Sequence, residues 1–269
     1  MLFKPANAHV NALFSLKGKV AFITGGSRGI GLGAAIGLAE AGADIAITYN
    51  SSSPEAMKEL TDSFAQYGVR FKAYKCNVTS KAAIEATTRE VLADFGRLDI
   101  VIPNAGICIH QPAEDFSEED FRTQMSVNLD GAYYTAQAAA KVFKEQKAAG
   151  TLDQGRIVFT ASVSSLIVNY PQKQAPYNAS KAGLVRLSAC LAVEWIDFAR
   201  VNCVSPGYID TDMLDVHPPE WKETWGQMIP AQRMCETYEL KGVYVFLASD
   251  ASSYMTGAEL VVGGGYTLT

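Results

Sequence analysis

Short runs of apolar residues alternate with longer segments in which apolar residues recur every three or four positions. The short runs have the length and composition of strands, and they are residues 19–24, 43–49, 69–76, 98–106, 155–162, 199–207 and 258–265. The longer segments have helical spacing, and they are residues 30–42, 53–68, 80–96, 117–148, 175–199 and 235–249. Strands that are apolar throughout and alternate with helices form a parallel sheet buried on both faces. The pattern therefore predicts an α/β protein, with a doubly wound parallel sheet of about seven strands and helices on both faces.

A single domain spanning residues 1–269 is expected, because the chain has no internal repeat, low-complexity tract or linker, and 48% of it is hydrophobic. Residues 1–15 precede the first strand and form an N-terminal arm. Residues 207–234 have no clear period and contain Pro218, Pro219, Trp221 and Trp225. Long irregular segments in compact domains are often functional, so we expect 207–234 to be a substrate lid.

The charge and cysteine content of the chain limit which partners and which compartment are expected. The net charge is −5 and there is no basic block, which argues against nucleic acid and acidic membrane surfaces. No apolar run has the length of a membrane span, and the first residues lack the pattern of a cleavable leader. The five cysteines have no metal-like spacing and are expected to be reduced thiols. A cytoplasmic protein is expected.

The first strand runs into "TGGSRGIG", residues 24–31, and a helix follows. Gly25, Gly29 and Gly31 would let the backbone turn tightly and approach a pyrophosphate, which the helix N-terminus would then bind through its unpaired N–H groups. The alternative is a plain glycine-rich loop. The strand–turn–helix context favours a dinucleotide site in a Rossmann-type fold.

The residues after the second strand indicate which dinucleotide binds. Tyr49 stands where an NAD site usually has an acidic residue for the ribose 2′-hydroxyl. Asn50, Ser51 and Ser52 offer neutral donors, and Arg28 offers a charged one. The alternative for Arg28 is a solvated surface side chain. With a cation available and no carboxylate to repel a 2′-phosphate, the sequence predicts NADP (NADPH) as the cofactor.

Tyr177 and Lys181 stand four residues apart in "YNASK" and would share one face of a helix. A solvated helix face is the usual interpretation of such a pair, but here it follows a nucleotide loop in the same chain. The strand 155–162 ends at Ser162. A strand end and a helix could bring Ser162 beside Tyr177 at the carboxyl edge of the sheet, where α/β folds bind ligands.

Two asparagines accompany these residues. Asn104 lies in "PNAG" after the fourth strand, where its side chain could brace the sheet next to a cofactor. A simple turn would explain this motif equally well if it stood alone. Asn128 lies in "VNLDG" on the long helical stretch.

Taken together, these motifs resemble the short-chain dehydrogenase/reductase family. The matching segments are TGxxxGxG at 24–31, NAG at 104–106, Asn at 128, Ser at 162, YxxxK at 177–181 and PG at 206–207. The resemblance runs from about residue 16 to the end of the chain. One departure is the gap between Ser162 and Tyr177, which is longer than in many members and leaves Ser164 as the alternative serine. Another is Asn77, where many members carry aspartate.

Four longer segments resemble, within this family, the fungal-type NADP-dependent polyol dehydrogenases and carbonyl reductases. The segments are "SLKGKV", "AYKCNV", "EWIDFARVNCVSPGYIDTDM" and "ASDASSYMTGAEL". That group includes mannitol 2-dehydrogenases, L-xylulose and sorbose reductases, and secondary-alcohol reductases. The resemblance implies a homotetramer that transfers hydride between NADPH and a sugar, polyol or ketone, without identifying the substrate.

The resemblance also implies a role for each matched residue. Tyr177 would be the general acid in carbonyl reduction, with its pKa lowered by Lys181 and the oxidised nicotinamide. Ser162 would bind the substrate oxygen, and Asn128 would hold a water that links Lys181 to solvent. No metal is required. The implied cofactor contacts are Gly25, Ser27, Arg28, Gly29, Ile30, Gly31, Tyr49, Asn50, Ser51, Asn77, Val78, Asn104, Ala105, Gly106, Tyr177, Lys181, Pro206, Gly207, Ile209 and Thr211.

The substrate pocket is expected to draw on residues 107–112, 163–174 and 207–230. Its polar candidates could bind sugar hydroxyls or could equally face water, and they are His110, Gln111, Ser164, Asn169 and Gln174. Trp221 and Trp225 would either close the pocket or pack the lid.

The leading hypothesis is an NADPH-dependent ketose reductase that runs backwards as a polyol dehydrogenase. The alternative is a broad carbonyl or secondary-alcohol reductase. A non-catalytic nucleotide-binding protein of the same fold would need none of Ser162, Tyr177, Lys181 and Asn128. An epimerase or dehydratase normally needs a second substrate-binding segment, for which this chain has no room.

Overall fold

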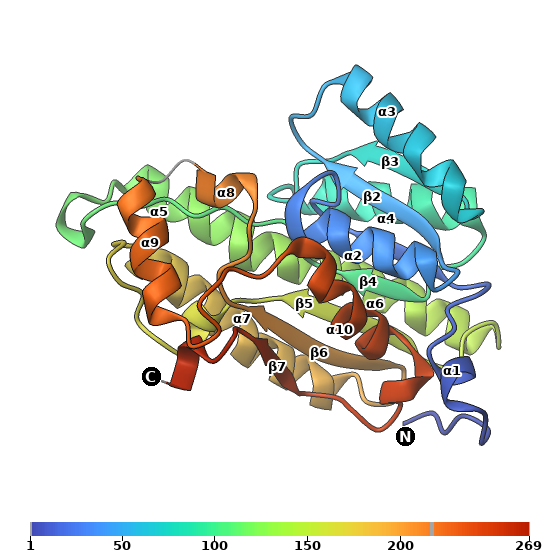
Figure 1. Ribbon diagram of the computed structural model, residues 1–269. Helices are drawn as coiled ribbons and strands as arrows, with labels where there is room; N and C mark the ends of the chain where they lie inside the picture. Colours follow the sequence, from blue (N-terminus) through green and yellow to red (C-terminus); the bar gives the residue numbers. More distant parts are fainter. Residues whose placement is uncertain (1, 216–217, 269) are drawn as a thin grey trace.

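The computed structural model of the protein describes residues 2–215 and 218–268, and within them one seven-stranded sheet (Figure 1). All strands are parallel, in the order β3-β2-β1-β4-β5-β6-β7. The strands are β1 (Val20–Ile23), β2 (Asp44–Tyr49), β3 (Phe71–Lys75), β4 (Ile100–Ile102), β5 (Gly155–Thr160), β6 (Ala199–Pro206) and β7 (Glu259–Val262). The predicted doubly wound parallel sheet is confirmed.

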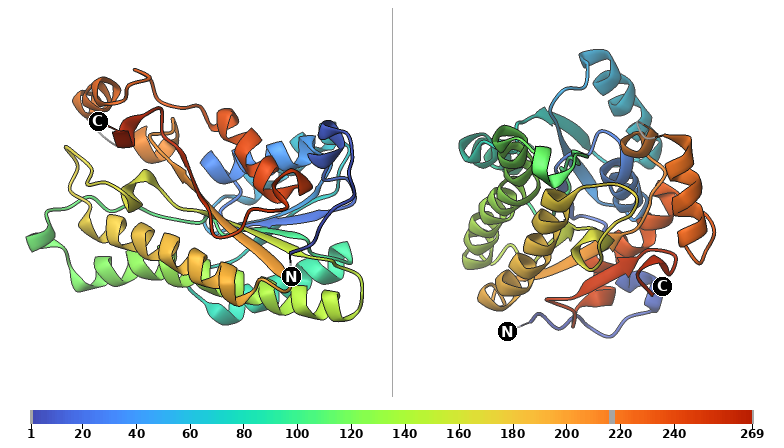
Figure 2. Two further views of the ribbon diagram at one scale, coloured as in Figure 1. Left: turned by 90° about the horizontal axis from the view of Figure 1, so that it is seen from below. Right: turned by 90° about the vertical axis from the view of Figure 1, so that its left-hand side faces the viewer.

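Helices cover both faces of the sheet, as the two views of Figure 2 show. One face carries α2, α3 and α10, and the other carries α4, α6 and α7. The helices are α1 (Val10–Leu13), α2 (Gly29–Glu40), α3 (Pro54–Phe64), α4 (Lys81–Phe95), α5 (Glu118–Met125), α6 (Gly131–Ala148), α7 (Ala175–Glu194), α8 (Asp212–Asp215), α9 (Pro219–Met228) and α10 (Lys241–Ala248). The Ser53 hydroxyl caps α3 by accepting from the Ala56 N–H at 3.2 Å, as its position before Pro54 predicts.

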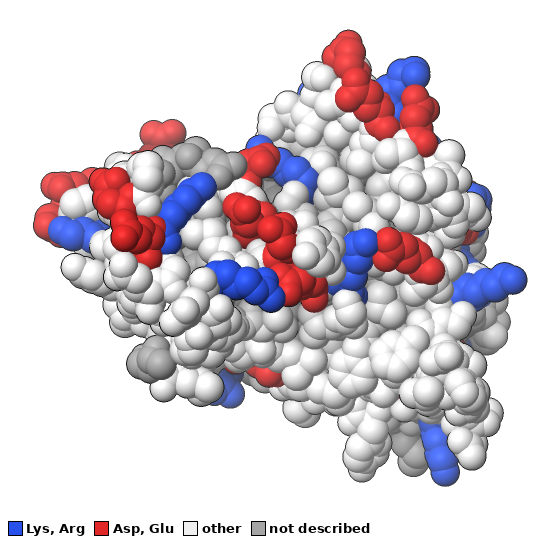
Figure 3. Space-filling model, in the orientation of Figure 1, with Lys and Arg blue, Asp and Glu red and all other residues white. Residues whose placement is uncertain are grey.

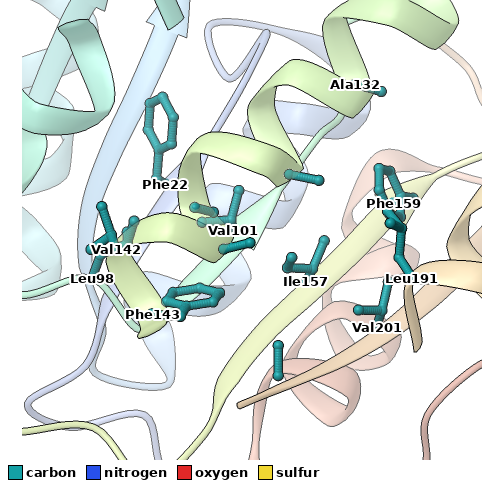
Figure 4. Close-up of a cluster of buried hydrophobic side chains, with 14 of the residues drawn as sticks. Phe22, Leu98, Val101, Ala132, Val142, Phe143, Ile157, Phe159, Leu191 and Val201 are labelled. Atoms are coloured by element: carbon teal, nitrogen blue, oxygen red, sulfur yellow. The ribbon is translucent and has the colours of Figure 1, made fainter. Parts of the chain in front are cut away.

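The core consists of two apolar layers, one on each side of the sheet. Successive residues of a strand point to opposite faces, so Phe22 joins the layer under α6 and α7 while Ile23 joins the layer under α2 and α10. Figure 4 shows the first layer, in which Phe143 from α6 and Leu191 from α7 pack against the sheet. Burial on both faces explains why the central strands are apolar throughout.

The sheet changes direction of winding at β1, which fixes where a ligand can bind. Phe22 of β1 pairs with Ala46 of β2 on one side and with Val101 of β4 on the other. The chain thus winds outward from β1 through β2 and β3, then returns to β4 and continues the other way. Ligands of such sheets bind in the crevice at the carboxyl ends of the two strands on either side of this switch point.

Two segments differ from the sequence prediction. The stretch 117–148 is helical, but a π-helical segment, Ser126–Asp130, separates α5 from α6. The stretch 207–234, expected to be irregular, contains the helices α8 and α9. Its prolines look like helix breakers, yet Pro219 is at the first turn of α9, where a proline nitrogen is tolerated because those N–H groups have no intrahelical partner. Residues 216 and 217 of this stretch lie outside the described part.

The described residues contain no helix that is long and apolar enough to cross a membrane. On the face seen in Figure 3, acidic and basic residues are scattered among one another rather than gathered by sign.

Candidate active site

The loop between β1 and α2 packs closely against Asn104, and this packing fixes the backbone of the loop. Gly25 has a φ of +64°, and a Cβ on Gly31 would collide with the Gly25 oxygen and the Asn104 side chain. The Asn104 amide donates to the backbone oxygens of Thr24 at 3.0 Å and Gly25 at 3.1 Å. The predicted bracing role of Asn104 is therefore present in the structure, and the bracing ties the loop after β1 to the end of β4.

This loop fits the pyrophosphate of a dinucleotide. Helix α2 begins at Gly29, so the N–H groups of its first turn lie at the end of β1 without intrahelical partners. The segment after β6 reaches the same place, because a Cβ on Gly29 would lie 3.6 Å from Thr211 Cγ2. The crevice is thus bordered by bare backbone on one side and by Thr211 on the other.

The residues predicted to select NADP surround the end of β2. Tyr49 is the last residue of β2, and Ser52 Oγ donates to Ser27 Oγ at 3.3 Å, so the β2 loop contacts the glycine loop. The Arg28 guanidinium lies 3.7 Å from the Asp212 carboxylate of α8, and both side chains are exposed, at 76% and 72%. Arg28 is therefore an exposed surface cation that pairs with Asp212 beside the glycine loop.

Asn77 and Val78 follow β3 on the same edge of the sheet. The Asn77 side chain accepts hydrogen bonds from Thr79, at 3.1 Å from its backbone N–H and 3.0 Å from its hydroxyl. Val78 is buried against Gly131 at the start of α6. The exposed Asn77 is thus fixed in a turn beside the crevice.

Ser162 and Tyr177 lie together in one pocket, as predicted. Ser162 follows β5 and precedes a short 3₁₀ turn, Val163–Ser165, and its hydroxyl accepts from the Ser164 N–H at 3.1 Å. Ser162 and Tyr177 both line this pocket, and the Ser162 side chain acts to lower the pKa of the Tyr177 phenol. Ser164, the alternative serine, is tied to Ser162 by a 3.1 Å contact between the two hydroxyls. Ser162 is therefore the serine placed against the tyrosine.

Lys181 and Asn128 lie behind Tyr177. Lys181 is only 3% exposed, and its ammonium donates to the Thr160 backbone oxygen at 2.9 Å. Its Nζ is 5.7 Å from the centre of the Tyr177 ring. A Cβ on Gly106 would lie 3.3 Å from Asn128 Oδ1 and 3.6 Å from Lys181 Nζ, which places both side chains against the same glycine.

The π-helical segment explains how Asn128 comes to face inward. Its Oδ1 accepts from the Ile107 N–H at 2.9 Å, and its Nδ2 donates to the Ile107 oxygen at 2.9 Å and to Ser180 Oγ at 3.1 Å. Such single π-turns often occur at functional sites. Asn128 thus ties the π-helical segment to α7 and to the loop that follows β4.

The pKa of the Tyr177 phenol differs from the sequence expectation. Burial raises it well above its usual value, and the Ser162 side chain opposes this only in part. Burial also lowers the Lys181 pKa to about 8. The expected lowering of the Tyr177 pKa depended on a positively charged nicotinamide as well as on Lys181. In the protein alone, desolvation is the dominant influence and keeps the phenol protonated.

The pocket in front of Tyr177 encloses about 100 Å³. Its lining residues are Ile30, Cys108, His110, Ala161, Ser162, Val163, Ser164, Asn169, Gln172, Gln174, Tyr177, Pro206, Gly207, Tyr208, Ile209, Thr211, Met213, Leu214 and Trp225. The predicted candidates His110, Ser164, Asn169 and Gln174 are therefore in the wall. Gln111, within the described chain, lies outside the lining, and its amide points to the Asp120 carboxylate at 3.5 Å.

One wall of the pocket is a connected row of buried amides. Gln174 Nε2 donates to Ser164 Oγ at 3.3 Å and to Asn169 Oδ1 at 3.1 Å. Gln172 Nε2 and Asn169 Nδ2 both donate to the Tyr208 hydroxyl, at 2.7 and 3.4 Å. These side chains supply donors and acceptors in fixed positions beside Ser162.

The lining residues Cys108, Gln172 and Tyr208 fall within the ranges expected to form the pocket, but the sequence analysis did not single them out. Two of them lie just beyond an identified motif, since Cys108 follows "NAG" and Tyr208 follows "PG". The position of these two residues after strand ends at the carboxyl edge of the sheet was the available signal.

Both tryptophans of the 207–234 segment contact the pocket region. Trp225 is fully buried, stacks on Tyr208 with ring centres 4.7 Å apart, and donates from Nε1 to Gln172 Oε1 at 3.0 Å. Trp221 meets the His110 ring edge-on at 6.4 Å. The sequence left open whether these tryptophans close the pocket or pack the lid. Trp225 does both, because it lines the pocket and packs α9 onto the pocket wall.

The fold and this site define a short-chain dehydrogenase/reductase, and the chain belongs to that family of oxidoreductases. The family model that matches, over residues 25–267, is described as enoyl-(acyl carrier protein) reductase. An NADP-dependent mannitol dehydrogenase of Alternaria alternata is 46% identical over 264 residues, or 97% of each chain. An L-xylulose reductase of Hypocrea jecorina is 46% identical over 275 residues, covering 98% of this chain and 95% of the relative.

Among solved structures, an NADPH-dependent 3-quinuclidinone reductase from Rhodotorula rubra superposes with a TM-score of 0.93. It is 39% identical, and the match covers 100% of this chain and 98% of that one. The predicted resemblance to the polyol dehydrogenase and carbonyl reductase group is confirmed. The predicted NADP cofactor agrees with the names of the mannitol dehydrogenase and the quinuclidinone reductase.

Proposed function

We propose that the protein is an NADPH-dependent ketose reductase that also runs in reverse as a polyol dehydrogenase, on a pair such as fructose and mannitol, L-xylulose and xylitol, or sorbose and sorbitol. The observation that carries this proposal is the row of amides formed by Gln172, Gln174 and Asn169 beside Ser162. A sugar presents several hydroxyls that must keep their hydrogen bonds when they leave water. Fixed amides can both donate to these hydroxyls and accept from them.

In this proposal Tyr177 is the acid and Ser162 holds the reacting oxygen. Burial keeps the Tyr177 phenol protonated at neutral pH, which suits a group that must give a proton to the oxygen of a carbonyl. Ser162, which lines the same pocket as Tyr177, donates to the same oxygen as negative charge develops on it. NADPH, when bound, supplies the hydride.

Lys181 and Asn128 restore the proton and position the tyrosine. With a pKa of about 8, Lys181 is mostly charged at neutral pH, and its charge favours the phenolate that remains after proton transfer. Asn128 holds the Ile107 backbone and adjoins Lys181 at Gly106. A water between these groups would carry the replacement proton from solvent to Lys181.

NADPH would lie along the crevice from the glycine loop to Pro206 and Thr211. Gly25, Gly29 and Gly31 and the N-terminus of α2 would hold the pyrophosphate, and Arg28 would pair with the 2′-phosphate in place of Asp212. The remaining predicted contacts stay part of the proposal, and they are Ser27, Ile30, Tyr49, Asn50, Ser51, Asn77, Val78, Asn104, Ala105, Gly106, Tyr177, Lys181, Gly207 and Ile209.

We extend the proposal to the arrangement of the whole chain as one catalytic domain. Residues 207–234 act as the substrate lid, since Met213, Leu214 and Trp225 from this segment line the pocket. Residues 1–15 would form the arm, and within its described part, residues 2–15, Phe14 packs on Phe246 of α10 with ring centres 6.2 Å apart.

Assembly into a homotetramer is the second extension. It is supported by the apolar C-terminal segment, in which Val261 and Leu268 are 42% and 86% exposed. The five free cysteines agree with the reducing cytoplasm as its compartment. Sedimentation should report about four chains per particle, and a fully active monomer would contradict the tetramer.

A second candidate is a broad carbonyl or secondary-alcohol reductase. The apolar part of the pocket lining favours it, because Ile30, Val163, Leu214 and Trp225 offer apolar surface. The similarity to the quinuclidinone reductase supports it as well.

Initial rates with NADPH across a panel of substrates separate the two candidates. The panel contains fructose, sorbose and L-xylulose on one side and small aryl ketones on the other. The proposal predicts a higher kcat/KM for at least one ketose than for every aryl ketone. If aryl ketones are reduced efficiently and no ketose is, the broad reductase is the correct assignment.

A further inference from the structure

A cysteine, a histidine and an amide oxygen meet at one point of the pocket wall. Cys108 Sγ lies 3.4 Å from His110 Nε2 and 3.7 Å from Gln174 Oε1. His110 Nε2 lies 3.1 Å from the same Gln174 oxygen. All three residues line the pocket, so the three atoms form a small triangle at its surface.

The separations between these three atoms match those between the ligand atoms of one tetrahedral metal ion. Zinc binds sulfur at about 2.3 Å and nitrogen or oxygen at about 2.0–2.2 Å. Ligands at these distances and at tetrahedral angles are separated by about 3.5 Å for sulfur–nitrogen, 3.6 Å for sulfur–oxygen and 3.3 Å for nitrogen–oxygen. The three observed separations differ from these values by only a few tenths of an ångström.

We propose that Cys108, His110 and Gln174 form an inhibitory site for a thiophilic divalent cation of the Zn²⁺ type. Sulfur and imidazole are the donors such ions prefer over the harder Mg²⁺ and Ca²⁺. The fourth position would face the pocket and hold water. The described residues contain no cluster of three or more His, Cys, Asp or Glu side chains. With only two strong ligands, the site binds reversibly and is not a structural zinc site.

Binding replaces protons, and the balance can be written out. The Cys108 thiol loses its proton to the buffer and binds as thiolate, and His110 binds as the neutral imidazole through Nε2. Gln174 contributes its Oε1, which already points at both partners. Burial raises the Cys108 pKa to about 12, so the metal must displace a proton that the thiol otherwise keeps.

The consequence for the enzyme follows from where Cys108 lies. Its charge state influences both Tyr177 and Lys181, which places it near the reacting groups. A cation on Cys108 and His110 would occupy the wall that a substrate must contact, and it would engage Gln174, the centre of the amide row. The metal would therefore exclude substrate.

Cobalt(II) binding to the full chain tests the site without substrate or NADPH, so its outcome does not depend on the proposed function. A thiolate ligand gives cobalt a charge-transfer band in the near ultraviolet, and Zn²⁺ should remove this band by displacement. The variants Cys108→Ser and His110→Ala each remove one ligand. Cys190→Ser, which removes an exposed thiol on α7, is the matched control.

The expected result is one cobalt per chain in the wild type and in Cys190→Ser. Cys108→Ser should abolish the charge-transfer band, and His110→Ala should weaken binding at least ~10-fold, since even outer-sphere partners of a metal are worth that much. Circular dichroism checks that each variant is folded. A band that persists in Cys108→Ser, or a wild type that gives no band, would overturn the proposal.

Discussion

The ammonium of Lys181, on α7, donates a 2.9 Å hydrogen bond to the backbone oxygen of Thr160, the last residue of β5. This bond fixes the lysine at the end of the strand from which Ser162 continues. The same helix carries Tyr177 one turn earlier, 5.7 Å from the lysine nitrogen. One strand end and one helix thus define the positions of all three groups.

Burial of Lys181 predicts a specific pH dependence of stability. Its pKa is about 8 in the folded protein and 10.5 in the reference state, so the unfolded chain binds more protons between these values. Stability from this group therefore rises as pH increases from 8 towards 10.5, by at most ~1.4 kcal/mol per pH unit. Below pH 8 the lysine is charged in both states, so the free energy cost of burying it does not change with pH.

Urea unfolding of wild type and Lys181→Met at several pH values below 8 and up to 10 measures this contribution. The free energy of unfolding of wild type minus that of the variant should be flat below pH 8 and should rise above it. A difference that stays flat over the whole range would show that Lys181 is not desolvated.

The two glycines Gly31 and Gly242 are expected to respond to alanine in opposite ways. A Cβ on Gly31 collides with the Gly25 oxygen and Asn104, so Gly31→Ala must distort the loop and should cost about 1–3 kcal/mol of stability and weaken NADPH binding. A Cβ on Gly242 in α10 meets no described atom within 4 Å. Gly242→Ala should therefore stabilise the helix by about 0.5–1 kcal/mol. Thermal unfolding measures the stability of both variants, and NADPH titration measures their cofactor affinity. If the two variants change stability in the same direction and by the same amount, the packing argument is wrong.

Arg28 should carry the preference for NADPH. A charge-assisted hydrogen bond to the 2′-phosphate contributes roughly 1.5–3 kcal/mol, so kcat/KM for NADPH should exceed that for NADH at least ~10-fold. Arg28→Ala should erode this ratio without harming NADH use. Tyr49→Asp should favour NADH, because a carboxylate repels phosphate and accepts from a free hydroxyl. An unchanged ratio in Arg28→Ala would exclude this phosphate site.

Gln174 should matter more for ketoses than for simple ketones. Gln174→Leu keeps the volume but removes the amide that contacts Ser164 and Asn169. We expect kcat/KM for the best ketose to fall at least ~10-fold, the loss of one to two buried hydrogen bonds, and to fall much less for an aryl ketone. Gln111→Leu, outside the pocket lining, is the control and should leave both values near wild type. If kcat/KM in Gln174→Leu falls equally for the ketose and the aryl ketone, Gln174 does not recognise sugar hydroxyls.

The sheet and the motif residues could be predicted because their signals are local. Strands buried on both faces are apolar throughout, and the glycine loop follows the first strand directly. The carboxyl edge of a parallel sheet then brings Ser162 and Tyr177 together without further information. The placement of Asn104 against Thr24 follows from the same edge.

Other features could not be predicted because they arise only from tertiary packing. The π-turn that carries Asn128 interrupts a helical pattern whose period continues on both sides. Helix α9 depends on Trp225 packing against Tyr208, a contact between distant segments. The raised Tyr177 pKa likewise reflects how deeply the phenol is buried, which no spacing reveals.

The central claim is that Tyr177 transfers the proton, and Tyr177→Phe tests it most directly. The variant keeps the ring that packs beside Lys181 and removes only the phenolic hydroxyl. Steady-state rates with NADPH and the best ketose should fall at least ~10²-fold, the low end for loss of a general acid. Fluorescence titration should find NADPH still bound. Turnover close to that of the wild type, with NADPH binding intact, would contradict the mechanism.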